Sequence, residues 1–185
     1  QKKALGLGHA VLTAKRIVGD DSFAVLLGDD IIDSGVPALR QMMDVYQRYP
    51  ATILAIQKVP KSQTQHYGII DAKRIEDGVY LVKDLVEKPS PGEAPSNLAI
   101  IGRYILTPGI FGALELTKPG KGGEIQLTDG LRLLMQKEPI YAYEFEGDRH
   151  DAGDKLGFLK ATVEFALKNE EFGDEFRSYL KKLKL

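Results

Sequence analysis

Phe23-Ala24-Val25-Leu26-Leu27 is a short, continuous apolar run that stops at Gly28-Asp29-Asp30. An uninterrupted run of this kind is typical of a strand buried on both faces, as in a parallel sheet. The segment from Val36 to Tyr46 then carries apolar residues at helical spacing, with Pro37 in its first turn. A second buried strand is predicted over Thr52–Ile56. Because strands alternate with helices, the chain belongs to the α/β class.

Glycine and proline divide the rest of the chain into further elements. Asp77-Gly78 predicts a hairpin turn into a strand over Val79–Val86, so some neighbouring strands are antiparallel. We therefore expect a mixed but mostly parallel sheet flanked by helices. Residues 1–185 are expected to form a single domain that ends in a helical segment over about residues 154–185. Further strands are predicted over Leu98–Leu106 and Ile140–Phe145, and a further helix over Leu127–Lys137.

The 185 residues are almost balanced in charge, with 25 Lys and Arg against 26 Asp and Glu. Such a chain has no overall field that draws it to nucleic acid or to an anionic membrane, so any phosphate must be bound locally. Cysteine is absent, which excludes disulfides and thiolate metal sites and fits a reducing compartment. No apolar run approaches the ~20 residues of a membrane span. We expect a cytoplasmic protein without nucleic-acid or membrane partners.

Acidic residues follow two of the predicted strands. Asp29 and Asp30 lie where the first strand stops, and Asp151 lies between a strand and the next helix. The carboxyl ends of strands are where open α/β sheets bind ligands. A carboxylate there suits Mg²⁺, which takes one or two carboxylates and leaves room for phosphate. The alternative is that these residues only cap turns.

Two lysines lie beside possible ligand positions. Glu87-Lys88-Pro89 closes a strand, where a Glu can accept hydroxyl hydrogen bonds and a Lys supplies a point charge for phosphate. A solvated strand end is the alternative. Lys155 lies in the first turn of a helix and opposes its dipole, which favours a phosphate partner. The alternative is that Asp154 caps this helix and Lys155 is simply exposed.

Two glycine-containing segments allow close backbone approach. Gly6-Leu7-Gly8-His9-Ala10 is neither a Walker A loop nor a dinucleotide fingerprint, because no Lys-Ser/Thr follows it and no strand precedes it. In the run Gly122–Asp129, Glu124 is suited to face a polyol, and Thr128 or Asp129 to cap a helix. The three histidines lack metal-ligand spacing.

Taken in order, these runs resemble the sugar-nucleotidyltransferase family along the whole chain. The most specific runs are Val86-Glu87-Lys88-Pro89, Ser96-Asn97-Leu98-Ala99 and Glu124-Ile125-Gln126-Leu127-Thr128-Asp129. The run from Gly6 to Ala10 and the run from Ser96 to Arg103 favour the branch of the family that transfers a uridylyl group. A sister enzyme that uses another nucleotide or sugar, and a non-catalytic module that binds sugar nucleotides, are the alternatives.

The resemblance implies a nucleotide-diphospho-sugar transferase fold and a direct, Mg²⁺-assisted reaction. In that reaction UTP and glucose 1-phosphate give UDP-glucose and pyrophosphate. The implied Mg²⁺ ligands are Asp29 and Asp151, and the implied catalytic phosphate contacts are Lys88 and Lys155. The implied substrate contacts are Glu87 for the glucose hydroxyls, Gly68, Asn97 and Glu124 for the sugar pocket, and Gln1 and Gly6 beside uracil.

The chain departs from the family pattern at its start. The family begins with a strand and a Gly-x-Gly-Thr-Arg loop that holds the triphosphate, roughly a third of such a protein, and the chain resembles about the remaining C-terminal two-thirds. Ala152 stands where Cys is often found, and Asp154 where Asn is common. We expect residues 1–185 alone to be inactive, because the family offsets the negative charge of the triphosphate largely with the missing loop. We also expect them to self-associate as a homo-oligomer, because the missing segment would leave a bare sheet edge and apolar face.

Overall fold

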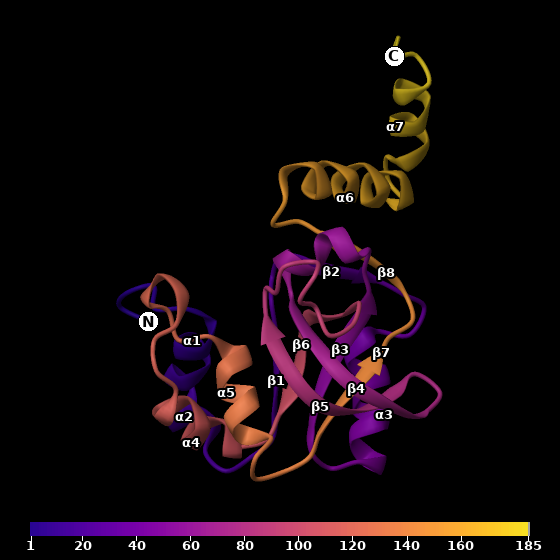
Figure 1. Cartoon of the computed structure of the whole chain (residues 1–185). Helices are drawn as coiled ribbons and strands as arrows, with labels where there is room; N and C mark the ends of the chain where they lie inside the picture. The colour runs from indigo at the N-terminus through magenta and orange to yellow at the C-terminus, as the bar shows by residue number, and fades with distance from the viewer. Residues whose placement is uncertain (185) are drawn as a thin grey trace. The chain divides into compact units, whose positions relative to one another are not determined.

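The computed structural model describes residues 1–184, and of Lys121 the backbone alone. The chain forms two compact units. Figure 1 colours the chain by residue number from the N-terminus to the C-terminus. The first unit comprises residues 1–26 and 36–146, and the second comprises residues 27–35 and the residues from 147 onward.

A six-stranded sheet forms the centre of the first unit (Figure 1). In spatial order its strands are β1 (Phe23–Leu26), β6 (Leu98–Leu106), β3 (Thr52–Lys58), β7 (Ile140–Glu144), β5 (Val79–Glu87) and β4 (Gly68–Glu76). β3 and β7 run parallel, whereas the other neighbouring pairs in this sheet are antiparallel. The prediction of a mixed sheet is therefore confirmed, but the prediction that it is mostly parallel is wrong. The cause is β6, which runs against both β1 and β3, together with the β4–β5 hairpin.

The two predicted buried strands differ in their burial. In β3, residues 52–56 are all buried, as their composition predicts. Burial of each Ile or Leu side chain there contributes roughly 1.5–3 kcal/mol to stability. In β1, exposure alternates along the strand and Leu26 is 52% exposed. The expectation that this strand is buried on both faces is wrong, because β1 lies at the end of the strand order with β6 as its neighbour.

Helices cover the sheet of the first unit. Figure 1 shows α1, α2, α4 and α5 grouped on one side of the sheet and α3 on the other. Their bounds are α1 (Leu7–Thr13), α2 (Lys15–Val18), α3 (Ala38–Arg48), α4 (Gly109–Leu116) and α5 (Leu127–Leu134), with short 3₁₀ turns at Lys61–His66 and Lys121–Gly123. Pro37 is the N-cap of α3 and has an extended ψ of 133°, so it precedes the first turn instead of lying in it. α5 ends three residues before the predicted Lys137.

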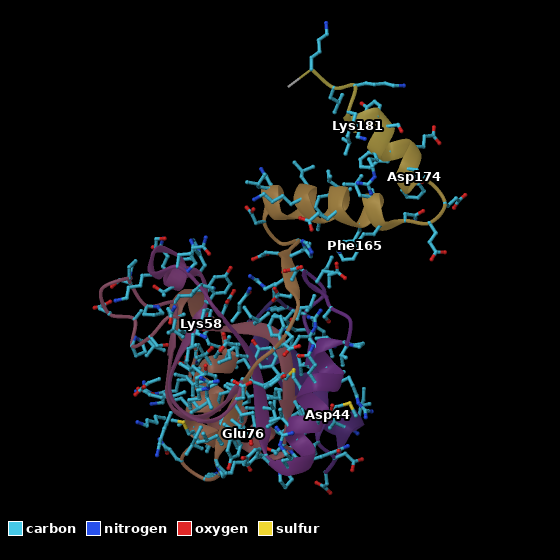
Figure 2. All side chains as sticks on the ribbon, turned by 90° about the vertical axis from the view of Figure 1, so that its right-hand side faces the viewer. Asp44, Lys58, Glu76, Phe165, Asp174 and Lys181 are labelled. Atoms are coloured by element: carbon cyan, nitrogen blue, oxygen red, sulfur yellow. The ribbon has the colours of Figure 1, made fainter. Side chains whose placement is uncertain are left out.

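The second unit contains a two-stranded sheet and two helices. β2 (Asp30–Asp33) pairs antiparallel with β8 (Asp148–Asp151), so that Asp30 lies opposite Asp151. The helices are α6 (Lys155–Lys168) and α7 (Gly173–Leu180). Phe165 of α6, labelled in Figure 2, packs edge-on against the buried ring of His150, with ring centroids 5.4 Å apart. No helix among residues 1–184 has the length and apolar character needed to cross a membrane.

Candidate active site

Glu87 lies at the end of β5, opposite Gly68 of β4. Its Oε2 accepts a 2.6 Å hydrogen bond from the hydroxyl of Thr128 in α5. A Cβ on Gly68 would lie 3.1 Å from Thr128 Oγ1 and 3.3 Å from Glu87 Oε2. The absence of a side chain at Gly68 therefore keeps the carboxylate and the hydroxyl uncrowded. The fold thus brings together three residues from β4, β5 and α5.

Lys88 has a backbone φ of +46°, the only positive φ of a non-glycine residue in the described part of the chain. Its N–H donates a 3.0 Å hydrogen bond to the carbonyl of Tyr67. Successive side chains in a strand point to opposite faces, and a left-handed residue interrupts that alternation. Lys88 Nζ accordingly lies 3.6 Å from Glu87 Oε1. A carboxylate oxygen and an ammonium group are therefore available to one ligand.

The segment before α1 pairs with the loop before α5. Gln1 Nε2 donates a 3.2 Å hydrogen bond to the carbonyl of Gly6 and lies 2.8 Å from Nδ1 of His9. Gly6 has a φ of +93°, and a Cβ there would lie 2.7 Å from the carbonyl oxygen of Ile125 and 2.9 Å from Cβ of Glu124. Only glycine fits this position without displacing the loop. The structure thus brings together Gln1, Gly6 and Glu124.

Asn97 is exposed and directly precedes β6. Its carbonyl accepts a 3.0 Å hydrogen bond from the N–H of Val59. Among the described residues, no hydrogen bond links the side chain of Asn97 to Glu87 or Gly68. Asn97 is therefore a predicted sugar-pocket residue that the structure does not join to the Glu87 group.

In the second unit, the carboxylates of Asp29 and Asp151 flank Gly153. A Cβ on Gly153 would lie 2.9 Å from Asp29 Oδ2 and 3.2 Å from Asp151 Oδ1. The two oxygens are therefore at most about 6.1 Å apart, a span that one hydrated cation can bridge. The missing side chain of Gly153 leaves the space between them open.

The donor set of this pair fits Mg²⁺. Asp151 is held by hydrogen bonds from Arg149 Nη2 to Oδ2 (2.9 Å) and from the N–H of Gly153 to Oδ1 (3.1 Å). The carboxylate of Asp29 has no hydrogen-bond partner within residues 1–184, although its backbone carbonyl accepts from the N–H of Ala152. The described residues contain no group of three or more His, Asp or Glu side chains arranged to hold a metal. Two carboxylates and open space are what Mg²⁺ needs when phosphates and waters supply its remaining ligands.

Lys155 is the first residue of α6 and is exposed. Asp154 is the N-cap, and its Oδ2 accepts a 2.9 Å hydrogen bond from the N–H of Gly157. The capping role considered for Asp154 is therefore confirmed. Lys155 also lines a shallow hollow of about 380 Å³ together with Gly153 and Phe158.

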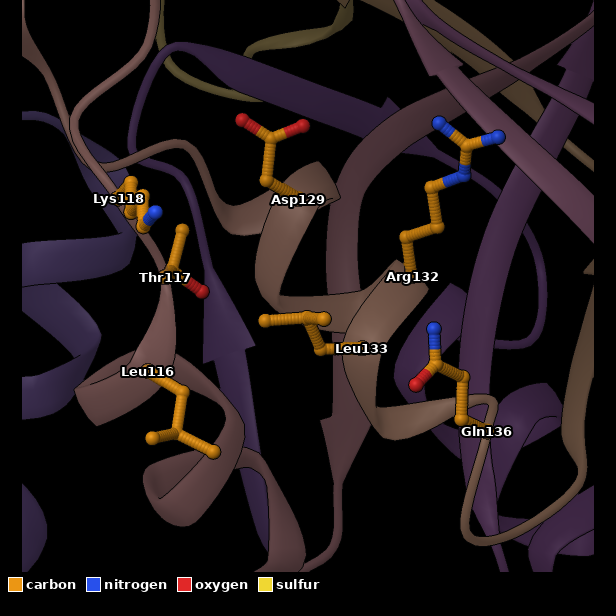
Figure 3. Close-up of a pocket in the computed structure, with 7 residues that line it drawn as sticks. All are labelled: Leu116, Thr117, Lys118, Asp129, Arg132, Leu133 and Gln136. Carbon is orange, nitrogen blue, oxygen red and sulfur yellow. The ribbon is translucent and has the colours of Figure 1, made fainter.

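A further hollow of about 570 Å³ lies in the first unit, between the end of α4 and α5 (Figure 3). None of the site residues predicted from the sequence lines it. Arg132, at its edge, forms a 2.9 Å ion pair with Asp84. The residues that line it are Leu116, Thr117, Lys118, Asp129, Arg132, Leu133 and Gln136.

Sequence reasoning missed two residues that hold the site side chains. Thr128 was considered only as a helix cap, whereas the N-cap of α5 is Gln126 and the hydroxyl of Thr128 binds Glu87. Arg149 was not considered, although its spacing of two residues from Asp151 places both side chains on one face of a strand. That spacing was the only signal in the sequence, and it acquires meaning once β8 is known to be a strand.

Comparisons with known proteins identify the family of the chain. A family model described as "Nucleotidyl transferase" matches residues 1–167. The chain belongs to the nucleotidyl transferase family. This nucleotidyl transferase is 51% identical over 183 residues to a UTP–glucose-1-phosphate uridylyltransferase of Staphylococcus epidermidis, and 52% identical over 183 residues to one of Staphylococcus haemolyticus. In both comparisons the match covers 99% of this chain and 64% of the relative, so the nucleotidyl transferase spans less than two thirds of their length.

Solved structures give the same match. A UDP-glucose pyrophosphorylase complexed with UDP-glucose superposes on the nucleotidyl transferase with a TM-score of 0.88 at 47% identity, over 90% of this chain and 64% of that one. A UTP-bound enzyme from Acinetobacter baumannii superposes with a TM-score of 0.88 at 39% identity, over 98% of this chain and 64% of that one. The expected nucleotide-diphospho-sugar transferase fold is thereby confirmed.

Proposed function

We propose that the protein transfers the uridylyl group of UTP to glucose 1-phosphate and so forms UDP-glucose and pyrophosphate. The observation that carries the proposal is the pairing of Glu87 and Lys88. The two side chains offer a hydroxyl acceptor and a phosphate-binding cation 3.6 Å apart, which matches a sugar phosphate. The names of the relatives at 51% and 52% identity supply the nucleotide and the sugar.

The proposed reaction is a direct in-line displacement. A phosphate oxygen of glucose 1-phosphate attacks the α-phosphorus of UTP, the bond to the bridging oxygen breaks, and pyrophosphate leaves with the electron pair. No covalent intermediate on the protein is needed, so the side chains act by positioning and by neutralising charge. Glu87 accepts hydrogen bonds from glucose hydroxyls, and Lys88 and Lys155 bind phosphate oxygens.

Gln1 and Gly6 are proposed as neighbours of the uracil ring, and Gly68, Asn97 and Glu124 as the lining of the sugar pocket. The support for Gln1, Gly6 and Glu124 is that the pairing of the two segments brings them together. Asn97 rests on the sequence resemblance alone. We further propose that both compact units belong to one nucleotidyltransferase domain.

Mg²⁺ is the proposed cofactor, and Asp29 and Asp151 are its proposed ligands. The support is the span of at most about 6.1 Å between their oxygens, together with the open space at Gly153. When bound there, the ion would offset negative charge on the phosphates. Asp29 and Asp151 provide the two negative charges that hold it.

A cytoplasmic location and a homo-oligomeric state complete the proposal. Large apolar side chains of the second unit are exposed, among them Phe158 at 55% and Phe172 at 44%, which favours association with another copy. Size-exclusion chromatography with light scattering measures that state directly, and a clean monomer would contradict it.

The activity is tested by a steady-state assay of pyrophosphate release with glucose 1-phosphate and each of UTP, dTTP, ATP and CTP. The protein is expressed from its complete natural reading frame. We expect turnover with UTP to exceed turnover with the other three nucleotides. Faster turnover with dTTP would instead favour the sister enzyme, and no turnover with any nucleotide would favour a binding module. The same assay on residues 1–185 tests the expectation that this chain alone is inactive.

A further inference from the structure

Three acidic residues and one arginine lie together where β2 meets β8. Asp30 and Asp151 are directly opposite each other across the two strands, and Asp29 directly precedes Asp30. Like charges that face each other across a strand pair destabilise the pair. The register therefore favours a cation that lies between these two carboxylates.

Arg149 supplies that cation from within β8. It lies two residues from Asp151, so both side chains are on the same face of the strand. Its Nε donates to Asp30 Oδ1, and its Nη2 donates a 2.9 Å hydrogen bond to Asp151 Oδ2. One planar guanidinium group therefore bridges both carboxylates, a geometry that a lysine ammonium cannot reproduce.

Burial distinguishes the roles of the carboxylates. The side chains of Arg149 and Asp30 are only 9% and 10% exposed, whereas that of Asp151 is 38% exposed. Arg149 and Asp30 thus form a buried ion pair that offsets its own charge. Asp151 presents its second oxygen, Oδ1, on the side of Gly153 where Asp29 Oδ2 also lies.

We infer that Arg149 is a positioning residue for the metal site. It fixes the orientation of Asp151 and pairs with Asp30, so that the three carboxylates and the guanidinium group together carry a net charge of −2 instead of −3. Asp30 is then an anchor for Arg149 and not a metal ligand. This inference rests on the proposed function, because it needs Asp29 and Asp151 to bind the cation.

The test is the affinity for MnCl₂ alone, measured by electron paramagnetic resonance on the protein from its complete reading frame. Mn²⁺ is a suitable probe because it accepts the same oxygen ligands as Mg²⁺. The simple variant Arg149→Met changes the charge of the cluster and the orientation of Asp151 together. Removing the positive charge would by itself strengthen Mn²⁺ binding. Two other variants separate these effects. Arg149→Lys keeps the positive charge but loses the planar guanidinium group that contacts both carboxylates. The double variant Asp30→Asn/Arg149→Met removes one charge of each sign.

We expect both variants to bind Mn²⁺ about 10–100-fold more weakly, the usual effect of losing a group that orients a metal ligand. The matched control is Arg40→Met, which removes an arginine with a 62%-exposed side chain from an ion pair on α3. Its partner Asp44 is labelled in Figure 2, and the Mn²⁺ affinity of this variant should be unchanged. Melting temperatures are recorded alongside. A merely structural role would lower the melting temperature of the variants without changing the Mn²⁺ affinity of the folded protein.

Unchanged or tighter binding by the charge-balanced double variant would overturn the role of Arg149. The variant Asp151→Asn distinguishes this result from a failure of the metal assignment. If Asp151→Asn weakens binding and the double variant does not, only the inference on Arg149 fails. If Asp151→Asn binds Mn²⁺ as the wild type does, the metal assignment fails and the inference fails with it.

Discussion

The hydroxyl of Thr128 donates a 2.6 Å hydrogen bond to Oε2 of Glu87, joining the first turn of α5 to the last residue of β5. Thr128 is buried and Glu87 is 24% exposed at its side chain, so this bond is largely shielded from water. It occupies one oxygen of the carboxylate and leaves Oε1 beside Lys88. Oε1 is therefore the oxygen of Glu87 that we propose accepts from a sugar hydroxyl.

Replacing Thr128 by Val removes the hydroxyl and keeps the shape of the side chain. Loss of a hydrogen bond to a charged group corresponds to about a tenfold change in affinity. We therefore expect the KM for glucose 1-phosphate to rise about tenfold, with little change in the KM for UTP. Thr128→Ser keeps the hydroxyl and is the control, which should stay near wild type. An equal rise in both KM values would mean that the hydrogen bond does not act through the sugar.

Lys88 combines a left-handed backbone with the proposed phosphate contact, and two substitutions separate these properties. Lys88→Ala removes the ammonium group but keeps the free-energy cost of holding a non-glycine residue at a positive φ. Lys88→Gly removes the ammonium group and that cost as well. We expect both variants to lose turnover strongly. The unfolding free energy of Lys88→Gly should exceed that of Lys88→Ala by about 1 kcal/mol, measured by urea denaturation. Turnover near wild type in either variant contradicts the phosphate role.

Gly157 in α6 allows the helix to approach Asp151 closely. A Cβ at this position would lie 1.9 Å from the carbonyl oxygen of Asp151, so Gly157→Ala must push the helix away from that residue. We expect the substitution to lower the unfolding free energy by about 1–3 kcal/mol and to weaken Mn²⁺ binding. The matched control is Gly112→Ala in α4, where a Cβ has no neighbour within 4 Å and should stabilise the helix by about 0.5–1 kcal/mol. Equal unfolding free energies for Gly157→Ala and Gly112→Ala would show that the close approach of α6 to Asp151 does not depend on Gly157.

Glu144, at the end of β7, is bound by Lys58 from β3 and Tyr80 from β5, with Lys58 Nζ at 2.7 and 2.9 Å and the Tyr80 hydroxyl at 2.8 Å. Burial alone raises the pKa of Glu144, but these hydrogen bonds outweigh it and the net pKa lies below the ordinary value of 4.5. A lowered carboxyl pKa stabilises the fold above the ordinary value, and that stabilisation is lost as the pH falls through the lower value.

Glu144→Gln should therefore lower the unfolding free energy by about 1 kcal/mol at pH 7. The difference from wild type should shrink once the pH falls below 4.5, because Glu144 of the unfolded chain then takes up a proton, whereas in the fold its pKa is lower. Urea denaturation at pH 7, 5 and 4 measures this difference. Glu115→Gln, which removes one partner of an exposed ion pair with Lys15, should change stability by at most a few tenths of a kcal/mol. A difference for Glu144→Gln that stays constant with pH would contradict the account.

Local sequence patterns predicted most of the elements and some of their bounds. The strand over Leu98–Leu106 and the Asp77-Gly78 hairpin agree with β6 and the β4–β5 turn. Strand direction was not predicted correctly, because an apolar run shows burial and does not show which neighbour a strand pairs with. The short run in β1 illustrates this, since it reads as a central strand yet lies at the end of the order.

The site was predictable in its charged residues and not in what holds them. Asp29 and Lys88 lie just after strands, and Glu87 and Asp151 are the last residues of theirs, and a sequence can show such strand ends. The bridge from Arg149 to Asp30 depends on the register of β2 with β8, and the bond from Thr128 to Glu87 joins residues 41 positions apart. Such pairings arise from tertiary structure, so no local pattern records them.

The most direct test of the proposed site is a crystal structure of the protein, from its complete reading frame, with UDP-glucose and Mg²⁺. We predict that Glu87 accepts hydrogen bonds from glucose hydroxyls, that Lys88 contacts a phosphate, and that the metal ion lies between Asp29 and Asp151. A glucose ring bound away from Glu87, or a metal ion coordinated by neither aspartate, would contradict the account.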